Sequence, residues 1–193
     1  MDKKVEQLIN KINSVGLSNN TIIIFLGDNG TPSEINSLYK GHLIKGGKGS
    51  TTTYGTNVPF IVEWPGKIAP QQLSGNLIDP SDFLPTLANI ANIEKPVNYG
   101  PLDGISFYPL LFGSEQRLRD WIYCNWNPVN SKKSFFKVWV QDENYKKYDS
   151  TYKNLFFNIA ADPLELNPIS FNQFTLSEIV RKKTFDSVLS VMH

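Results

Sequence analysis

The hydrophobic positions change their spacing along the chain, and each spacing predicts a different element. Near the N-terminus they recur every three or four residues, so residues 5–15 predict an amphipathic helix. Residues 22–26, IIIFL, are continuously apolar and bounded by turn residues. This is typical of a central strand covered on both faces in a parallel sheet. Residues 58–63 predict a second strand. Helix, turn and buried strand form half of a βαβ unit.

The chain becomes richer in predicted strands near Arg119. Before that point, residues 81–91 predict a helix whose core face we assign to Leu84, Leu87, Ile90 and Ala91. After it, short apolar segments separated by turn residues indicate an antiparallel meander, and residues 176–192 predict a terminal amphipathic helix.

The predicted fold class is therefore α/β. A partial, mostly parallel sheet flanked by helices is followed by a smaller β-rich, antiparallel C-terminal subdomain with a terminal helix. The predicted domains are residues 1–118 and residues 119–193.

Charge and composition exclude several classes of protein. The net charge of +1 gives no field that would attract nucleic acid, and no apolar run is long enough to cross a membrane. One cysteine excludes a multi-cysteine zinc site, and the presence of only two histidines argues against a histidine-based triad. The cysteine, Cys124, lies in the aromatic context WIYCNWNP, which favours a buried small hydrophobe over a nucleophilic thiol.

The first candidate for chemistry is the Asp28-Asn29-Gly30 segment that follows the buried run. Ligands of open α/β sheets bind beyond the carboxyl ends of strands, and a carboxylate beside a carboxamide offers two oxygen donors for Ca²⁺ or Mg²⁺. The alternative is an ordinary Asx turn with Gly30 at positive φ. Two oxygens do not satisfy calcium, so any further ligands come from elsewhere.

A second candidate is Lys48, in the glycine-rich segment KGGKGST within the long irregular stretch 27–55. This segment is not a phosphate-binding P-loop, because Lys48 is followed by Gly49 and the next regular element is a strand. Lys48 on a glycine-flanked loop can hold a sulfuryl or phosphoryl oxygen as a point charge. The alternative is a solvated loop lysine.

A third pair, Asp162 and Glu165 in ADPLELNP, suggests acid/base chemistry by its spacing. Asp162-Pro163 is also a turn signature, and no pattern places this segment near the other candidates. We therefore assign it a structural role.

The order of several segments resembles the C-terminal half of arylsulfatase-type sulfatases, of the alkaline-phosphatase-like superfamily. The segments are NNTIIIFLGDNG, GGKGSTTTYGTNVPFIVEWPGKI, DPSDFLPTLANIA, LDGISFYPLLFG and LFFNIAADPLELNP. The resemblance implies that Asp28 and Asn29 bind Ca²⁺, with Mg²⁺ as a possible substitute. It also implies that Lys48 contacts the sulfate and the leaving oxygen of a sulfate-ester small molecule or sulfated glycan.

Other parts of the family pattern are missing. No Cys-x-Pro-x-Arg type motif is present, and Cys124 does not match one, so the formylglycine nucleophile is expected on a separate N-terminal half. The paired aspartates, histidine and lysine of that half are also absent, and residues 51–54 read TTTY where many members have an acidic residue. We expect a sulfatase portion that is inactive alone, exposes an unpaired strand edge, has marginal solubility and takes the missing half as its partner.

Two other functions stay open at this stage. One is a phosphohydrolase or phosphoryl transferase of the same superfamily, and the other is a non-catalytic remnant that serves as a binding domain. The family implies a periplasmic, extracellular or lysosomal location, whereas the N-terminal residues show no signal-peptide pattern, so localisation stays open.

Overall fold

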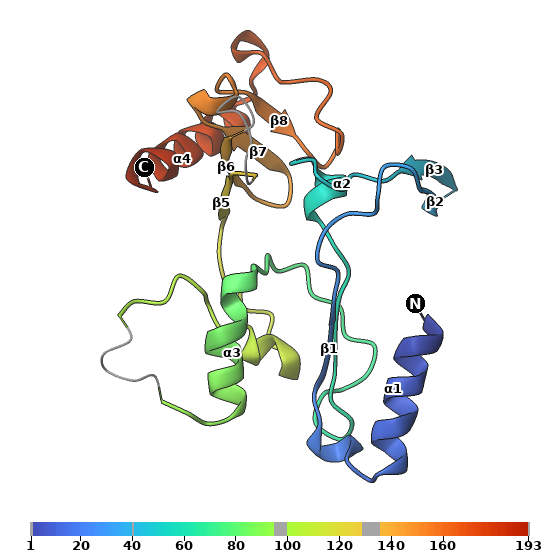
Figure 1. The fold of residues 1–193 in the computed structure, drawn as a ribbon. Helices are drawn as coiled ribbons and strands as arrows, with labels where there is room; N and C mark the ends of the chain where they lie inside the picture. The colour runs from blue at the N-terminus through green and yellow to red at the C-terminus, as the bar shows by residue number, and fades with distance from the viewer. Residues whose placement is uncertain (1, 40, 95–99, 129–135, 193) are drawn as a thin grey trace. The chain divides into compact units, whose positions relative to one another are not determined.

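The computed structural model describes residues 2–39, 41–94, 100–128 and 136–192. They form a mixed α/β fold in two compact units, which Figure 1 shows as ribbons. The first unit comprises Met1–Gly27 and Pro59–Leu118, and the second comprises Asp28–Val58 and Arg119–His193. No helix in the described ranges is long and apolar enough to cross a membrane. The predicted division into domains 1–118 and 119–193 stays a prediction.

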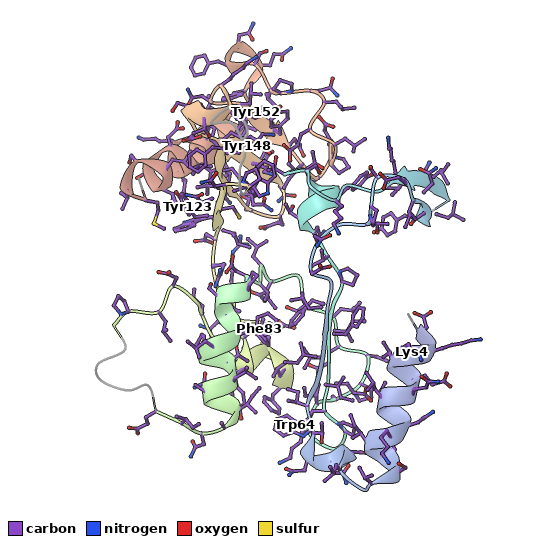
Figure 2. The ribbon with its side chains drawn as sticks, in the orientation of Figure 1. Lys4, Trp64, Phe83, Tyr123, Tyr148 and Tyr152 are labelled. Atoms are coloured by element: carbon purple, nitrogen blue, oxygen red, sulfur yellow. The ribbon has the colours of Figure 1, made fainter. Side chains whose placement is uncertain are left out.

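The first unit contains α1 (Asp2–Ser14), β1 (Ile23–Leu26), β4 (Phe60–Glu63) and α3 (Phe83–Ile90). Its core is centred on Phe107, Leu110 and Leu111. The rings of Phe60, Phe83 and Phe107 contact one another edge to face, with centroids 5.4–5.7 Å apart. This aromatic contact joins β4 to α3, and Figure 2 labels Phe83 within it.

The described strands do not include the parallel pairs that we expected around residues 22–26. β1 pairs antiparallel with β4, and Ile24 lies opposite Val62. All other described strand pairs are also antiparallel. The expected burial on both faces is also not seen in the described residues, because β1 is only partly buried and Leu26 is 42% exposed. An apolar run does not by itself determine the direction of its partner strand.

The core face of α3 also differs from the predicted one. Leu84 and Leu87 are 50% and 45% exposed, whereas Thr86 is fully buried. The Thr86 hydroxyl donates to the carbonyl oxygen of Asp82 and accepts from the amide of Phe107. A polar side chain with both bonds made can occupy the core. The predicted face is correct in part, because Ile90 packs against the core cluster together with Phe83.

The second unit contains a four-stranded sheet in the order β5 (Ile122–Trp126), β6 (Lys137–Gln141), β7 (Tyr145–Tyr148) and β8 (Phe156–Asn158). This confirms the predicted antiparallel meander. Val138 and Val140 point to one face, where they pack with Phe185 of α4 (Leu176–Met192). Trp139 points to the opposite face and packs with Tyr148. The sheet is thus covered on one face by the terminal helix (Figure 1).

Three elements of the second unit fall within the stretch 27–55 and its end, where no regular structure was predicted. They are β2 (Asn36–Tyr39), β3 (His42–Lys45) and α2 (Thr53–Thr56). The first two form an antiparallel hairpin whose residues are almost all exposed. Because no face of the hairpin is buried, its sequence lacks the apolar alternation that identifies a strand.

Candidate functional site

Asp28 and Asn29 follow β1 in a bend, with Asp28 exposed and Asn29 partly buried. The next residue, Gly30, is buried, and its amide donates to the carbonyl oxygen of Gly55 at 3.0 Å. A Cβ atom at Gly30 would lie 2.1 Å from the carbonyl oxygen of Tyr54. Only glycine permits this approach, so the segment after β1 packs directly against α2.

Lys48 lies in a tight turn that is closed by a 2.9 Å hydrogen bond from the Ser50 amide to the Gly47 carbonyl oxygen. Gly49 supplies the left-handed conformation of this turn, with φ of 81°. The Lys48 amide donates to the carbonyl oxygen of Thr31 at 2.9 Å. The structure therefore brings the backbone of the Lys48 turn beside the segment that begins at Asp28.

The side chains of Asp28, Asn29 and Lys48 make no hydrogen bond or ion pair with the residues described. The carboxylate and carboxamide oxygens therefore remain available, and such hard donors fit Ca²⁺ or Mg²⁺. Within the same ranges, no group of three or more His, Cys, Asp or Glu side chains is placed to hold a metal. The metal and sulfate roles of these residues stay predictions.

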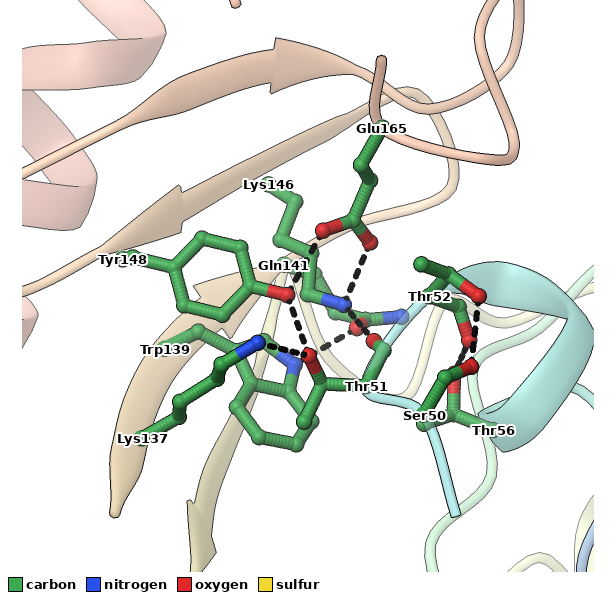
Figure 3. A network of polar contacts seen from close by, with 10 residues as sticks. All are labelled: Ser50, Thr51, Thr52, Thr56, Lys137, Trp139, Gln141, Lys146, Tyr148 and Glu165. Carbon is green, nitrogen blue, oxygen red and sulfur yellow. Dashed lines mark hydrogen bonds and ion pairs between the residues drawn. The ribbon is translucent and has the colours of Figure 1, made fainter. Parts of the chain in front are cut away.

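A buried polar network joins Thr51, three residues after Lys48, to the C-terminal sheet (Figure 3). Its members, which we call the Thr51 network, are Thr51, Lys146, Tyr148 and Glu165. The Lys146 ammonium bonds the Thr51 carbonyl oxygen and lies 2.8 Å from Glu165 Oε1. The Tyr148 hydroxyl lies 2.6 Å from Glu165 Oε2 and 2.8 Å from Thr51 Oγ1. These four contacts form a closed circuit.

Burial shifts the pKa values of the groups in and around this network. Loss of solvent lowers the pKa of Lys146, and the nearby Glu165 carboxylate opposes that effect. Burial raises the pKa of the Tyr148 hydroxyl, and Glu165 raises it further. Lys137, whose ammonium lies 3.3 Å from Thr51 Oγ1, also has a pKa lowered by burial. Its ammonium stands 3.9 Å from the centre of the Tyr152 ring.

The network adds a location to the segment ADPLELNP, to which we assigned a structural role: it lies beside the loop that follows the second candidate, Lys48. Glu165 contacts side chains that hold Thr51, and the Thr53 amide donates to the carbonyl oxygen of Pro163 at 3.2 Å. The turn formed by Asp162-Pro163 is the feature that presents Glu165 to the sheet. The sequence signal for this network is the lysine pair in NYKKYD, which falls within a predicted strand. Lys146 is buried in that strand, and a buried charge requires a partner.

Cys124 lies in β5 opposite Trp139 and is partly buried. It packs against the apolar cluster of Trp139 and Tyr148. Its surroundings agree with the interpretation of a small packing residue.

Comparisons with known proteins identify the family to which the chain belongs. A family model described as Sulfatase matches residues 1–93, and one described as N-sulphoglucosamine sulphohydrolase, C-terminal, matches residues 52–187. The second covers more than half of the chain, and the chain belongs to the sulfatase family. Within that family of sulfuric ester hydrolases, it corresponds to the C-terminal portion.

Two relatives illustrate the similarity in sequence. Steryl-sulfatase of Rattus norvegicus is 30% identical over 204 residues, covering 88% of this chain and 35% of the relative. Arylsulfatase A of Bos taurus is 31% identical over 186 residues, covering 92% of this chain and 36% of the relative. The chain thus spans about a third of the length of these relatives.

Two solved structures share the fold. BT4656 in complex with its substrate D-glucosamine-2-N,6-O-disulfate gives a TM-score of 0.70 at 22% identity, covering 99% of this chain and 37% of that chain. PsFucS1 sulfatase from Pseudoalteromonas sp. gives 0.69 at 22% identity, covering 99% and 41%. At this level of identity the likeness establishes the fold alone.

Proposed function

We propose that this chain supplies part of the active site of a calcium-dependent sulfuric ester hydrolase. Asp28 and Asn29 would be two of the metal ligands, and Lys48 would contact the sulfate group. The observation that carries the proposal is the hydrogen bond from the Lys48 amide to Thr31, which places the lysine turn beside the segment of the two oxygen donors.

The chemistry of these side chains suits the breaking of a sulfate ester. A bound divalent ion acts as a Lewis acid on the sulfuryl oxygens. Asp28 and Asn29 hold and orient that ion with hard oxygen donors. Lys48 adds a fixed positive charge for the oxygens that gain negative charge as the ester bond breaks. The nucleophile is not among these residues, so the chain alone is inactive in this proposal.

The substrate class follows from the family. Relatives include steryl-sulfatases and a protein named ulvan-active sulfatase, while BT4656 binds a disulfated glucosamine. We place the substrate of this chain in the same range, as a sulfate-ester small molecule or a sulfated glycan. Sulfate rather than phosphate is the anion that the family membership favours.

The partner in this proposal is the N-terminal portion of a sulfatase, which would carry the formylglycine and the remaining metal ligands. Two features support it. The chain spans about a third of its relatives. In the first unit, large apolar side chains lie open, with Leu8 67% and Ile61 60% exposed. Apolar area of this kind marks surfaces that another polypeptide covers.

The proposal is tested by residue-resolved NMR titration of the full chain, first with CaCl₂ and then with Na₂SO₄ at constant ionic strength. We expect millimolar Ca²⁺ to shift the amide signals of residues 28–31, because a site with few ligands binds weakly. Sulfate should then shift the signals of residues 47–50. Lys48→Met should abolish the sulfate response, whereas the matched variant Lys45→Met, which removes another exposed lysine, should retain it.

Shifts spread evenly over surface lysines, or an equal response in both variants, would contradict the role of Lys48. A parallel titration with inorganic phosphate tests the choice of anion, and tighter phosphate binding would favour a phosphohydrolase. Turnover of an aryl sulfate by the isolated chain in Ca²⁺ would overturn the claim that the nucleophile lies elsewhere.

A further inference from the structure

The turn that carries Lys48 is attached on both sides. Before the turn closes, the Lys48 amide bonds the Thr31 carbonyl oxygen; after it, Thr51 enters the buried network on the sheet. We propose that Lys146, Tyr148 and Glu165 are positioning residues that hold the Lys48 turn in place for sulfate binding, through their contacts with Thr51. The purpose of this positioning rests on the proposed function, but the attachment itself is testable without it.

The chemistry of the four side chains fixes the direction of every hydrogen bond in the network. The ammonium of Lys146 only donates and the carboxylate of Glu165 only accepts. The Tyr148 hydroxyl, which lies 2.6 Å from Glu165, therefore donates to the carboxylate and accepts from Thr51 Oγ1. Thr51 Oγ1 in turn accepts from the ammonium of Lys137. Only one arrangement of protons satisfies this set, so each polar group of Thr51 in the network has a defined partner.

Burial makes the arrangement hard to explain as a surface ion pair. The side chains of Lys146 and Glu165 are 1% and 4% exposed. Placing a charge in such surroundings is unfavourable unless it is paired and hydrogen-bonded. Glu165 supplies the opposite charge, and the Thr51 carbonyl oxygen supplies a further acceptor for the Lys146 ammonium. Withdrawal of the loop would leave the Lys146 ammonium short of a partner. The sheet therefore favours the docked position of the loop.

The sheet does not require this network for its own pairing. β7 is already bonded through its backbone to β6 and β8. The two segments that the network adds, the loop at Thr51 and the turn that carries Glu165, both lie outside the sheet. The polar groups of Lys146 and Tyr148 thus bind two segments, the Thr51 loop and the Glu165 turn, that are not paired to the sheet as strands.

A short path leads from Thr51 to Lys48. The Ser50 hydroxyl lies 2.8 Å from Thr52 Oγ1, and the Ser50 amide closes the turn at Gly47. Thr52 is the N-cap residue of α2, and its carbonyl oxygen accepts from the amides of Gly55 and Thr56. Fixing Thr51 therefore fixes both the closing residue of the Lys48 turn and the start of the helix behind it.

The experiment compares two variants of the full chain with a matched control. Glu165→Gln removes the carboxylate that joins Lys146 to Tyr148. Asp142→Asn makes the same chemical change at another buried carboxylate of this sheet, which pairs with Arg181 at 2.9 Å and does not contact the loop. The readouts are amide hydrogen exchange at Lys48 and Ser50, and the rate of trypsin cleavage after Lys48, identified by mass spectrometry.

We expect Glu165→Gln to raise both rates at the turn by about tenfold or more, the factor that corresponds to the loss of one or two net hydrogen bonds. Asp142→Asn should leave both rates unchanged. Glu165→Gln leaves a buried ammonium unpaired, which destabilises the sheet itself. The triple variant Lys146→Met, Tyr148→Phe, Glu165→Leu therefore provides a second test. Apolar replacement of a buried ion pair commonly preserves stability.

The triple variant should keep the exchange protection of β6 and β7 and lose that of the turn. A folded triple variant whose turn exchanges and is cleaved as slowly as the wild type would overturn the positioning role. Sulfate titration of the same variant separates the two proposals. If the turn of the triple variant is loosened but its sulfate binding is unchanged, the link between positioning and function is refuted. If the wild-type turn exchanges more slowly than that of the variant but the wild type binds no sulfate, only the proposed function is refuted.

Discussion

Glu165 joins two residues of the sheet to a distant loop, and the residues around it in the sequence do not indicate this role. Its carboxylate holds Lys146 and Tyr148, which lie on one strand, and both of these contact Thr51 in a distant loop. The sequence does predict Lys48 as the charged residue of a glycine-flanked turn, because that property is local. It does not predict the Thr51 network, because its members come together from three segments only after folding.

The buried hydroxyl of Tyr148 has a measurable consequence at alkaline pH. Its pKa is raised above the ordinary value of 10.0, mainly by burial, so the folded chain keeps this proton where the unfolded chain loses it. The contribution is present below pH 10 and is lost as the pH rises further, because the unfolded state then binds fewer protons. Tyr148→Phe removes the group from both states.

We therefore expect the free energy of unfolding to fall less steeply with pH above 10 in Tyr148→Phe than in the wild type. One proton corresponds to a difference in slope of about 1.4 kcal/mol per pH unit. Urea unfolding between pH 8 and pH 11 measures both slopes, and the pH 8 values give each protein its own baseline. Tyr145, whose pKa burial also raises, leaves part of the slope in the variant. Parallel curves would show that Tyr148 ionises equally in both states.

At the scale of elements, patterns produced by one buried face were predicted well. Val138, Trp139 and Val140 alternate between the two faces of the sheet, and α4 buries Phe185 and Leu189. The predicted N-terminal helix also forms, although none of its residues is buried in the described chain. The exposed hairpin β2–β3 has no such face, so its sequence resembles a loop. The core face of α3 was predicted only in part. Ile90 packs against the core as expected, whereas Thr86 is buried through hydrogen bonds that sequence spacing does not show.

The glycine contacts around the candidate site belong to the same scale. Gly30 and Gly47 each pack against the backbone of Tyr54, where a Cβ atom would come within 2.1 Å and 2.5 Å of its atoms. The sequence indicates that both glycines lie in turns, but it does not indicate that both pack against the backbone of Tyr54. Their close approach holds the segment after β1, the Lys48 turn and α2 as one backbone cluster, and that arrangement required the structure.

At the scale of the molecule, the first unit presents apolar surface of the kind that a partner covers. None of the residues of α1 is buried, and Ile61 on β4 is 60% exposed. The predicted unpaired strand edge agrees with these exposures, because β1 and β4 form a sheet of only two strands in the described ranges. Isolated two-stranded sheets have little stability of their own in water.

We expect the isolated chain to self-associate through this surface. Ile61→Lys should reduce the association measured by sedimentation velocity, because a charge opposes burial of the strand face. The matched variant Glu63→Lys adds a lysine two residues along the same strand without removing apolar area, and it should not reduce association. A wild-type chain that is monomeric and melts cooperatively would contradict the expectation and weaken the case for an N-terminal partner.

The most direct test of the proposed site is the distance between the two proposed metal ligands, Asp28 and Asn29, and Lys48 in solution. Mn²⁺, which accepts the same oxygen donors as Ca²⁺, broadens the NMR signals of nearby amides. We predict that Mn²⁺ selectively broadens residues 28–31 and 47–49, and that the double variant Asp28→Asn, Asn29→Ala abolishes both effects. Broadening at residues 28–31 that leaves the Lys48 amide unaffected, or broadening that survives in the double variant, would contradict a shared site.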